Sequence, residues 1–188
     1  MANQKTLFDS LGISSKPENI YLNAGAPGPK SLAKCSALML KASNMRLDPN
    51  NDPYIMQYGP ELGDCTYLQN LASFLSEQYN NVVDPTSLIC TSGASNGLHM
   101  TMSILYSKES PIIFVEELSY HLAFKVLHCY TDSPLVPVSL LQNGINISEF
   151  ELLLTQHKPS DVENRKYPWA VLYAIPTYHN PTGLYYSE

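Results

Sequence analysis

Residues 87–115 read SLICTSGASNGLHMTMSILYSKESPIIFV, and the order of residue types in this stretch predicts the fold. An apolar run over 87–91 leads into a glycine-containing turn and then into a helical pattern over 97–106. A second apolar run follows over 111–115. The stretch therefore predicts a strand, a turn, a helix and another strand, which is the repeating unit of a parallel sheet.

The same alternation continues toward the carboxyl end. We expect helices over 119–130 and 148–157 and strands over 135–139 and 170–175; before the sheet we expect helices over 31–46 and 66–79, the second capped by Thr66. The strands lack polar alternation, which is typical of sheets buried on both faces. The predicted fold class is therefore α/β, with a mostly parallel sheet and helices on both faces.

The pattern stops on a strand and the turn 180–183, where another helix would normally cover the sheet. We therefore expect the architecture to be incomplete. Two regions are predicted: an N-terminal segment with the first helix over 1–50, and an incomplete large domain over 51–188.

Composition excludes several classes of function. The formal net charge is -6 and the basic residues are scattered, so neither nucleic acid nor an anionic membrane surface is an expected partner. No apolar run approaches the roughly 20 residues of a membrane span. The four cysteines lie far apart without metal-ligand spacing, and the chain start lacks a signal peptide. We expect reduced thiols, no metal site and a cytoplasmic location.

The turn over 91–98, TSGASNGL, follows an apolar strand and opens a helix. Glycines let backbone N–H groups converge on one anion, and a helix amino terminus favours negative charge. Ser95 adds a hydroxyl donor. Taken alone, the segment is better explained by an ordinary strand-to-helix turn, since it is neither G-x-G-x-x-G nor a P-loop.

Two further segments follow the carboxyl ends of predicted strands, the edge where open parallel sheets bind ligands. Ser119-Tyr120 places an aromatic ring there, and 180–183, Asn-Pro-Thr-Gly, places an amide. An aromatic ring stacks on flat heterocycles, and an amide N–H donates to a phenolate-like oxygen. Alone, Tyr120 also fits a ring packed on the sheet, and 180–183 fits a simple turn.

These motifs occur in one order: Tyr58-Gly59-x-x-x-Gly63, then 92–97, then Ser119-Tyr120, then 180–183. With this ordered set the chain resembles the amino-terminal portion of class I/II aminotransferases of the fold-type-I pyridoxal-phosphate superfamily. It is most similar to the aminoadipate/kynurenine aminotransferase-like group, from about Tyr21 to Gly183. The resemblance implies an incomplete aspartate aminotransferase-like fold, with 51–188 as the cofactor-binding domain.

The resemblance also implies roles at the matching positions. Ala94 and Ser95 would bind the phosphate of pyridoxal 5′-phosphate, and Tyr120 would stack on its pyridine ring. Asn180 would bond the phenolic oxygen of that ring. Tyr58 would reach the phosphate of a neighbouring subunit, which implies a homodimer, and Gly25 would belong to the loop that closes over substrate.

The family's cofactor-binding lysine, its pyridine-pairing aspartate and its substrate-binding arginine all lie beyond Asn-Pro-Thr-Gly. None of the lysines of the chain matches the family position, so no catalytic residue is assigned. The complete protein is expected to exchange an amino group between an amino acid and a 2-oxo acid, with this chain an inactive fragment.

Three alternatives stay open at this point. The first is a carbon-sulfur lyase or cyclase with the same fold and cofactor. The second is a non-catalytic truncated isoform or ligand-binding domain. The third is a generic nucleotide-binding α/β domain, which the absence of both glycine-rich fingerprints disfavours.

Overall fold

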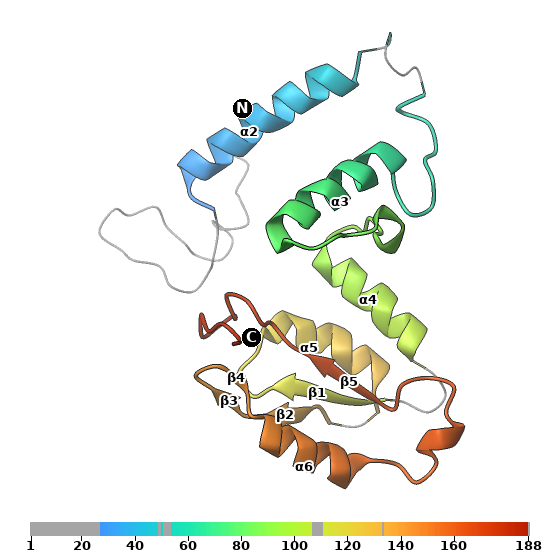
Figure 1. Cartoon of the computed structure of the whole chain (residues 1–188), viewed down its shortest axis with the longest axis vertical. Helices are drawn as coiled ribbons and strands as arrows, with labels where there is room; N and C mark the ends of the chain where they lie inside the picture. Colours follow the sequence, from blue (N-terminus) through green and yellow to red (C-terminus); the bar gives the residue numbers. More distant parts are fainter. Residues whose placement is uncertain (1–26, 49, 51–53, 107–110, 133, 188) are drawn as a thin grey trace, which may run out of the picture. The chain divides into compact units, whose positions relative to one another are not determined.

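The computed structural model describes residues 27–48, 50, 54–106, 111–132 and 134–187. The chain divides into two compact units, residues 1–60 and 61–188. Figure 1 traces the elements of each unit along the sequence. The expected division after residue 50 stays a prediction.

The first unit contributes helix α2, Pro29–Arg46, which confirms the helix expected over 31–46. Proline in the first turn suits a helix start, because its missing N–H would have no partner there. No residue of α2 is buried, and its apolar side chains Leu38, Met39 and Met45 are exposed.

The second unit is built on a three-stranded parallel sheet. Strand β1, Ile112–Glu116, lies between β2, Val136–Val138, and β5, Ala170–Tyr173. In the register, Phe114 of β1 lies opposite Val136 on one side and Leu172 on the other. Three of the four apolar runs expected as strands are thus confirmed, and their parallel arrangement is the predicted one.

Helices α4, Ala94–Leu105, and α5, His121–Leu127, contribute to the core on one face of the sheet. Side chains alternate along a strand, so Ile113 and Val115 of β1 share one face. They form a buried cluster with Met102 of α4 and Leu127 of α5. A 3-10 turn, η2, His128–Tyr130, extends α5 to the end of the predicted helix.

Helix α6, Ile147–His157, packs on the opposite face of the sheet (Figure 1). Phe114, which alternation turns toward this face, is fully buried, and its ring meets that of Phe150 at 5.3 Å between centroids in an edge-to-face arrangement. The sheet is therefore covered on both faces, as its apolar strands require.

The strand predicted over 87–91 is wrong. The segment begins with a 3-10 turn, η1, Pro85–Ser87, and continues as extended backbone from Leu88. A strand needs a neighbour with which to exchange hydrogen bonds, and within the described residues this segment pairs with none of β1, β2 and β5. In the described part of the chain, the Cys90 N–H instead donates to the Leu62 carbonyl at 2.8 Å.

Helix α3, Cys65–Tyr79, is confirmed, but its N-terminal cap lies two residues earlier than expected. Asp64, not Thr66, caps it: the Asp64 carboxylate accepts from the Tyr67 N–H at 2.8 Å. Asn80 ends the helix in the left-handed conformation, with φ of 48°. Both ends of α3 thus satisfy backbone groups that the helix itself leaves unpaired.

A small antiparallel hairpin, β3, Leu140–Leu141, and β4, Gly144–Ile145, was not predicted. Tyr186 and Ser187 pack on this hairpin. A Cβ on Gly144 would lie 3.0 Å from the Tyr186 ring, and the Ser187 N–H donates to the Asn143 carbonyl. The segment between α6 and β5 contains a 3-10 turn, η3, Val162–Asn164.

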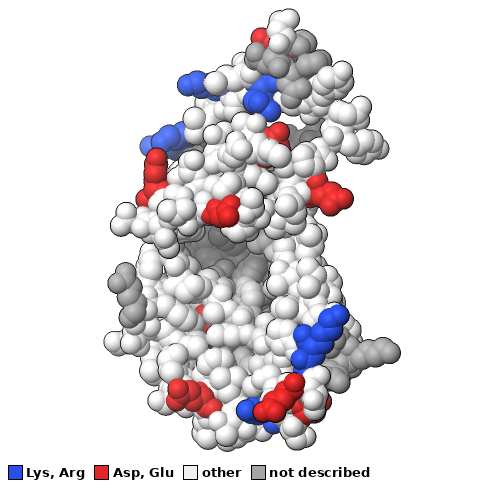
Figure 2. All heavy atoms as spheres, turned by 45° about the vertical axis from the view of Figure 1, so that its right-hand side comes forward, with Lys and Arg blue, Asp and Glu red and all other residues white. Residues whose placement is uncertain are grey.

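On the face shown in Figure 2, acidic and basic side chains lie interspersed on a mostly uncharged surface. Within the residues that the structure describes, no helix is both long enough and apolar enough to cross a bilayer.

Candidate functional site

The candidate site lies at the carboxyl edge of the sheet. Strands β1 and β5 are parallel neighbours, with Val115 opposite Tyr173, so the segments that follow them leave from the same edge. The first segment leads to Tyr120 and the second to Asn180. The topology therefore brings together two of the residues that the sequence singled out.

Tyr120 is half-buried and precedes the first residue of α5. Its ring meets His121 edge-to-face at 5.6 Å. Burial raises the pKa of Tyr173 on β5, and the charge of Glu116 and the phenol of Tyr120 raise it further. Tyr120 thus lies close enough to β5 to influence its electrostatics.

Asn180 is exposed, in a loop with unusual backbone conformations. Tyr178 has φ of 50° and Gly183 has φ of 75°, and the Asn180–Pro181 peptide bond is cis. A bulky residue at positive φ is uncommon and is held only by the surrounding structure. No residue in the described part of the chain forms a hydrogen bond with the Asn180 side chain, so its amide is available to a ligand.

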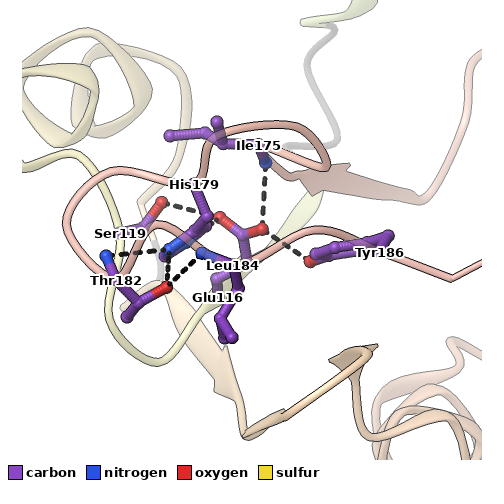
Figure 3. A network of polar contacts seen from close by, with 7 residues as sticks. All are labelled: Glu116, Ser119, Ile175, His179, Thr182, Leu184 and Tyr186. Atoms are coloured by element: carbon purple, nitrogen blue, oxygen red, sulfur yellow. Dashed lines mark hydrogen bonds and ion pairs between the residues drawn. The ribbon is translucent and has the colours of Figure 1, made fainter.

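A buried carboxylate joins the two loops (Figure 3). Glu116, the last residue of β1, is 0% exposed. Its Oε2 accepts from Ser119 Oγ at 3.0 Å and from His179 Nε2 at 3.0 Å. Its Oε1 accepts from the Ile175 N–H at 2.9 Å and from the Tyr186 hydroxyl at 2.5 Å. Four donors match the capacity of an ionised carboxylate.

His179, 1% exposed, uses both ring nitrogens. Nε2 donates to Glu116, and Nδ1 lies 2.7 Å from Thr182 Oγ1 and 3.4 Å from the Thr182 backbone nitrogen. Because the Leu184 N–H donates to the Thr182 hydroxyl oxygen, the hydroxyl proton is left to point at Nδ1. This network assigns the neutral imidazole with its proton on Nε2.

The Tyr186 hydroxyl completes the carboxylate's set of donors. Burial, the hydrogen bond to Glu116 and the Glu116 charge all raise the pKa of Tyr186 above its usual range. Sequence reasoning assigned no role to Glu116 or Tyr186. The available signal was an acidic residue continuing an apolar strand, which buries a charge unless donors meet it.

The turn before α4 has the geometry that an anion needs. Gly93 has φ of 89° and no side-chain cap, so the N–H groups of Ala94, Ser95 and Asn96 have no acceptor in the described part of the chain. A side-chain hydrogen bond stabilises the turn: Asn96 Oδ1 accepts from the Ser92 N–H at 3.2 Å. Asn96 is thus partly used within the turn, whereas the Ser95 hydroxyl is exposed.

Steric constraints explain why position 63 of the Tyr-Gly-x-x-x-Gly motif is a glycine. Its φ is 124°, and a Cβ there would lie 2.6 Å from Cys90 Sγ. The loop before α3 therefore packs directly on the segment that leads to the 91–98 turn. Only glycine permits both the conformation and the close approach.

The remaining predicted positions are not joined to these residues. Within the described residues, no hydrogen bond joins Ala94 or Ser95 to Tyr120 or Asn180. Tyr58 belongs to the first unit and is 97% exposed. Gly25 lies outside the described residues.

No protein-family profile matches the chain. Among curated proteins, aromatic-amino-acid aminotransferase 1 of Thermococcus litoralis is 26% identical over 133 residues, which cover 71% of this chain. The match covers 30% of that relative, so the matched region spans less than a third of its length.

Solved structures with similar folds are aminotransferases. A kynurenine aminotransferase from Pyrococcus horikoshii, solved with PMP, superposes with a TM-score of 0.68 at 22% identity, over 89% of this chain and 39% of that one. The multiple substrate aminotransferase of Thermococcus profundus gives 0.69 at 19% identity, over 95% and 42%. The predicted fold class and the resemblance to aminotransferases are confirmed.

Proposed function

We propose that residues 61–188 form the part of a pyridoxal 5′-phosphate site that holds the cofactor, and that the whole protein transfers an amino group between an amino acid and a 2-oxo acid. The observation that carries the proposal is the meeting of the Tyr120 and Asn180 loops on one buried carboxylate at the carboxyl edge of β1 and β5. The likeness to an aromatic-amino-acid aminotransferase supports the choice of reaction.

The phosphate would bind at the start of α4. The unpaired N–H groups of Ala94 and Ser95, with the Ser95 hydroxyl, offer donors to a dianion at the positive end of the helix dipole. The turn is open, since a Cβ on Gly93 would meet nothing within 4 Å. These features fit a phosphate and leave room for it.

The ring would bind between the strand-end loops. Tyr120 supplies an aromatic face, and Asn180 supplies an amide donor for the phenolic oxygen. When bound, the cofactor supplies the electron sink of the reaction, and the protein supplies orientation and charge.

Proton transfer in this reaction class requires a base, which in the resembling family is a lysine. No lysine of this chain matches that position, so we assign binding and orientation, but no catalytic step, to its residues. We further propose a cytoplasmic homodimer, in which the 97% exposed Tyr58 side chain reaches the phosphate of a second copy.

The test uses pyridoxamine 5′-phosphate, which binds without a covalent bond to lysine. Isothermal titration of the chain is expected to give saturable binding at one ligand per chain. Ser95→Ala and Asn180→Ala should each weaken it about ten- to a hundredfold, since a hydrogen bond to a charged group contributes about 1.5–3 kcal/mol.

Ser103→Ala is the matched control, because Ser103 lies on the same helix and its hydroxyl donates to the Met100 carbonyl. It should leave the affinity unchanged. No saturable binding by the unmodified chain, or equal affinities in all variants, would overturn the proposed function.

A further inference from the structure

Glu116 is the most unusual residue of the second unit that the proposed chemistry does not use. It extends a strand whose other residues are apolar, and its side chain is fully buried. Removing a carboxylate from water is costly unless donors replace the lost hydration. Four donors converge on Glu116, which makes its environment a complete polar site within the core.

The donors come from the two loops that carry the proposed ring-binding residues. Ser119 immediately precedes Tyr120, and its hydroxyl donates to Glu116 Oε2. His179 immediately precedes Asn180, and its Nε2 donates to the same oxygen. One carboxylate oxygen therefore holds the neighbour of each ring-binding residue, as the close view in Figure 3 shows for Ser119 and His179.

The Asn180 loop is fixed on both sides of Asn180. Before it, the Ile175 N–H donates to Glu116 Oε1 at 2.9 Å. After it, Thr182 contacts His179 Nδ1, and the His179 N–H donates to the Leu184 carbonyl at 3.0 Å. Asn180 itself is exposed at the turn. The hydrogen bonds of His179 therefore determine the backbone conformation that positions the Asn180 side-chain amide.

We propose that Glu116 is a positioning residue of the cofactor site, acting through His179 on Asn180 and through Ser119 on Tyr120. The inference rests on the proposed function, because it concerns the same site. Glu116 does not touch the ligand; it fixes the relative placement of a donor and an aromatic face that come from loops 60 residues apart in sequence, at 120 and 180.

The chemistry of the carboxylate makes the proposal testable by a near-isosteric change. Glu116→Gln replaces one acceptor oxygen by an amide that carries two N–H groups. Whichever way the amide turns, its N–H groups face two donors, so at least one loop loses its anchor. Tyr186→Phe removes a donor from Oε1 instead, leaves both loop contacts on Oε2, and keeps the backbone bond from Tyr186 to Pro176.

The experiment measures pyridoxamine 5′-phosphate bound to the intact chain, by affinity and by the pH at which the ligand's 3-hydroxyl ionises, followed by absorbance. A donor at Asn180 stabilises the ionised oxygen, so Asn180→Ala should raise that pH. Glu116→Gln should raise it in the same direction and weaken binding about three- to tenfold. Tyr186→Phe should leave the ionisation unshifted, and Glu116→Gln combined with Asn180→Ala should shift it no further than Asn180→Ala alone.

A second pair of variants covers the case in which Glu116→Gln fails to fold, as circular dichroism would show. His179→Gln keeps an N–H donor for Glu116 but loses the contact between Nδ1 and Thr182, whereas His179→Leu loses both. The ionisation should therefore shift less in His179→Gln than in His179→Leu, which should resemble Asn180→Ala. An unshifted ionisation in Glu116→Gln or in His179→Leu, or additive shifts in the double variant, would overturn the inference while leaving the proposed function intact. Absence of ligand binding by the unmodified chain would overturn both.

Discussion

At the scale of single residues, two glycines of the second unit have opposite steric surroundings. Gly63 has φ of 124° and lies against Cys90, whereas Gly97 lies within α4, where an added Cβ would make an ordinary contact with Thr91 at 3.4 Å. A helical glycine lowers stability relative to alanine, and a glycine at positive φ does not.

Gly63→Ala is therefore expected to lower the free energy of unfolding by about 1–3 kcal/mol, through strain and overlap with the Cys90 sulfur. Gly97→Ala should raise it by about 0.5–1 kcal/mol. Urea titration followed by circular dichroism measures both. The assignment of close packing at Gly63 would be wrong if the two substitutions had the same sign.

Tyr186 links stability to alkaline pH. Its pKa in the folded chain is raised by burial and by Glu116, so the stabilisation is complete below its unfolded pKa of about 10 and is lost as pH rises through the folded value. The free energy of unfolding should fall above pH about 10, and it should fall less steeply in Tyr186→Phe. Urea titrations at a series of pH values compare the slopes.

Tyr79→Phe is the control for that series, because Tyr79 is exposed at the end of α3. Its slope should match that of the unmodified chain. A Tyr186→Phe slope equal to the unmodified one would contradict the hydrogen bond between Tyr186 and Glu116.

At the scale of elements, the start of α3 offers two candidate N-terminal caps that lie two residues apart. Asp64 and Thr66 are both suitable residue types. The extended backbone of Asp64, with ψ of 125°, lets its carboxylate reach the Tyr67 N–H, while Thr66 already lies within the helix. The residue that caps α3 is thus decided by the backbone conformation at the position where the helix begins.

Asp64→Ala is expected to destabilise the chain by about 1 kcal/mol, because it leaves a helix N–H unpaired and removes a charge that favours the helix dipole. Thr66→Ala should change stability by less than about 0.5 kcal/mol. Thermal unfolding followed at 222 nm compares the two variants. Equal losses would argue that Asp64 does not cap α3.

At the scale of the whole molecule, the two units differ in how their elements are stabilised. Strand β1 is buried between two strands and two layers of helices, whereas α2 has no buried residue in the described structure. Within the described residues α2 therefore gains little from tertiary packing, and helices without such packing are marginal in water. Local stability should therefore be unequal along the chain.

Hydrogen exchange followed by mass spectrometry should show slow exchange over β1 and fast exchange over α2. Raising the protein concentration tests the proposed homodimer at the same time, since a second copy that covered α2 would slow its exchange. Protection of α2 equal to that of β1 at every concentration would contradict the description of α2 as unpacked.

The sequence by itself determined the elements and the edge of the sheet where the site lies. Apolar runs without alternation are typical of strands covered on both faces, and β1, β2 and β5 form at three of the four places where such runs lie. The positions of Tyr120 and Asn180 after β1 and β5 follow from the same pattern, because parallel strands end at one edge.

Only the tertiary structure decided which residues meet. Residues 87–91 look like a strand by composition, yet strand formation requires a neighbouring strand, and none of the strands in the described residues pairs with this segment. Glu116 and His179 lie 63 positions apart and meet because β5 pairs beside β1. A local sequence pattern carries no information on such a pairing, since it arises from the fold that buries both side chains together.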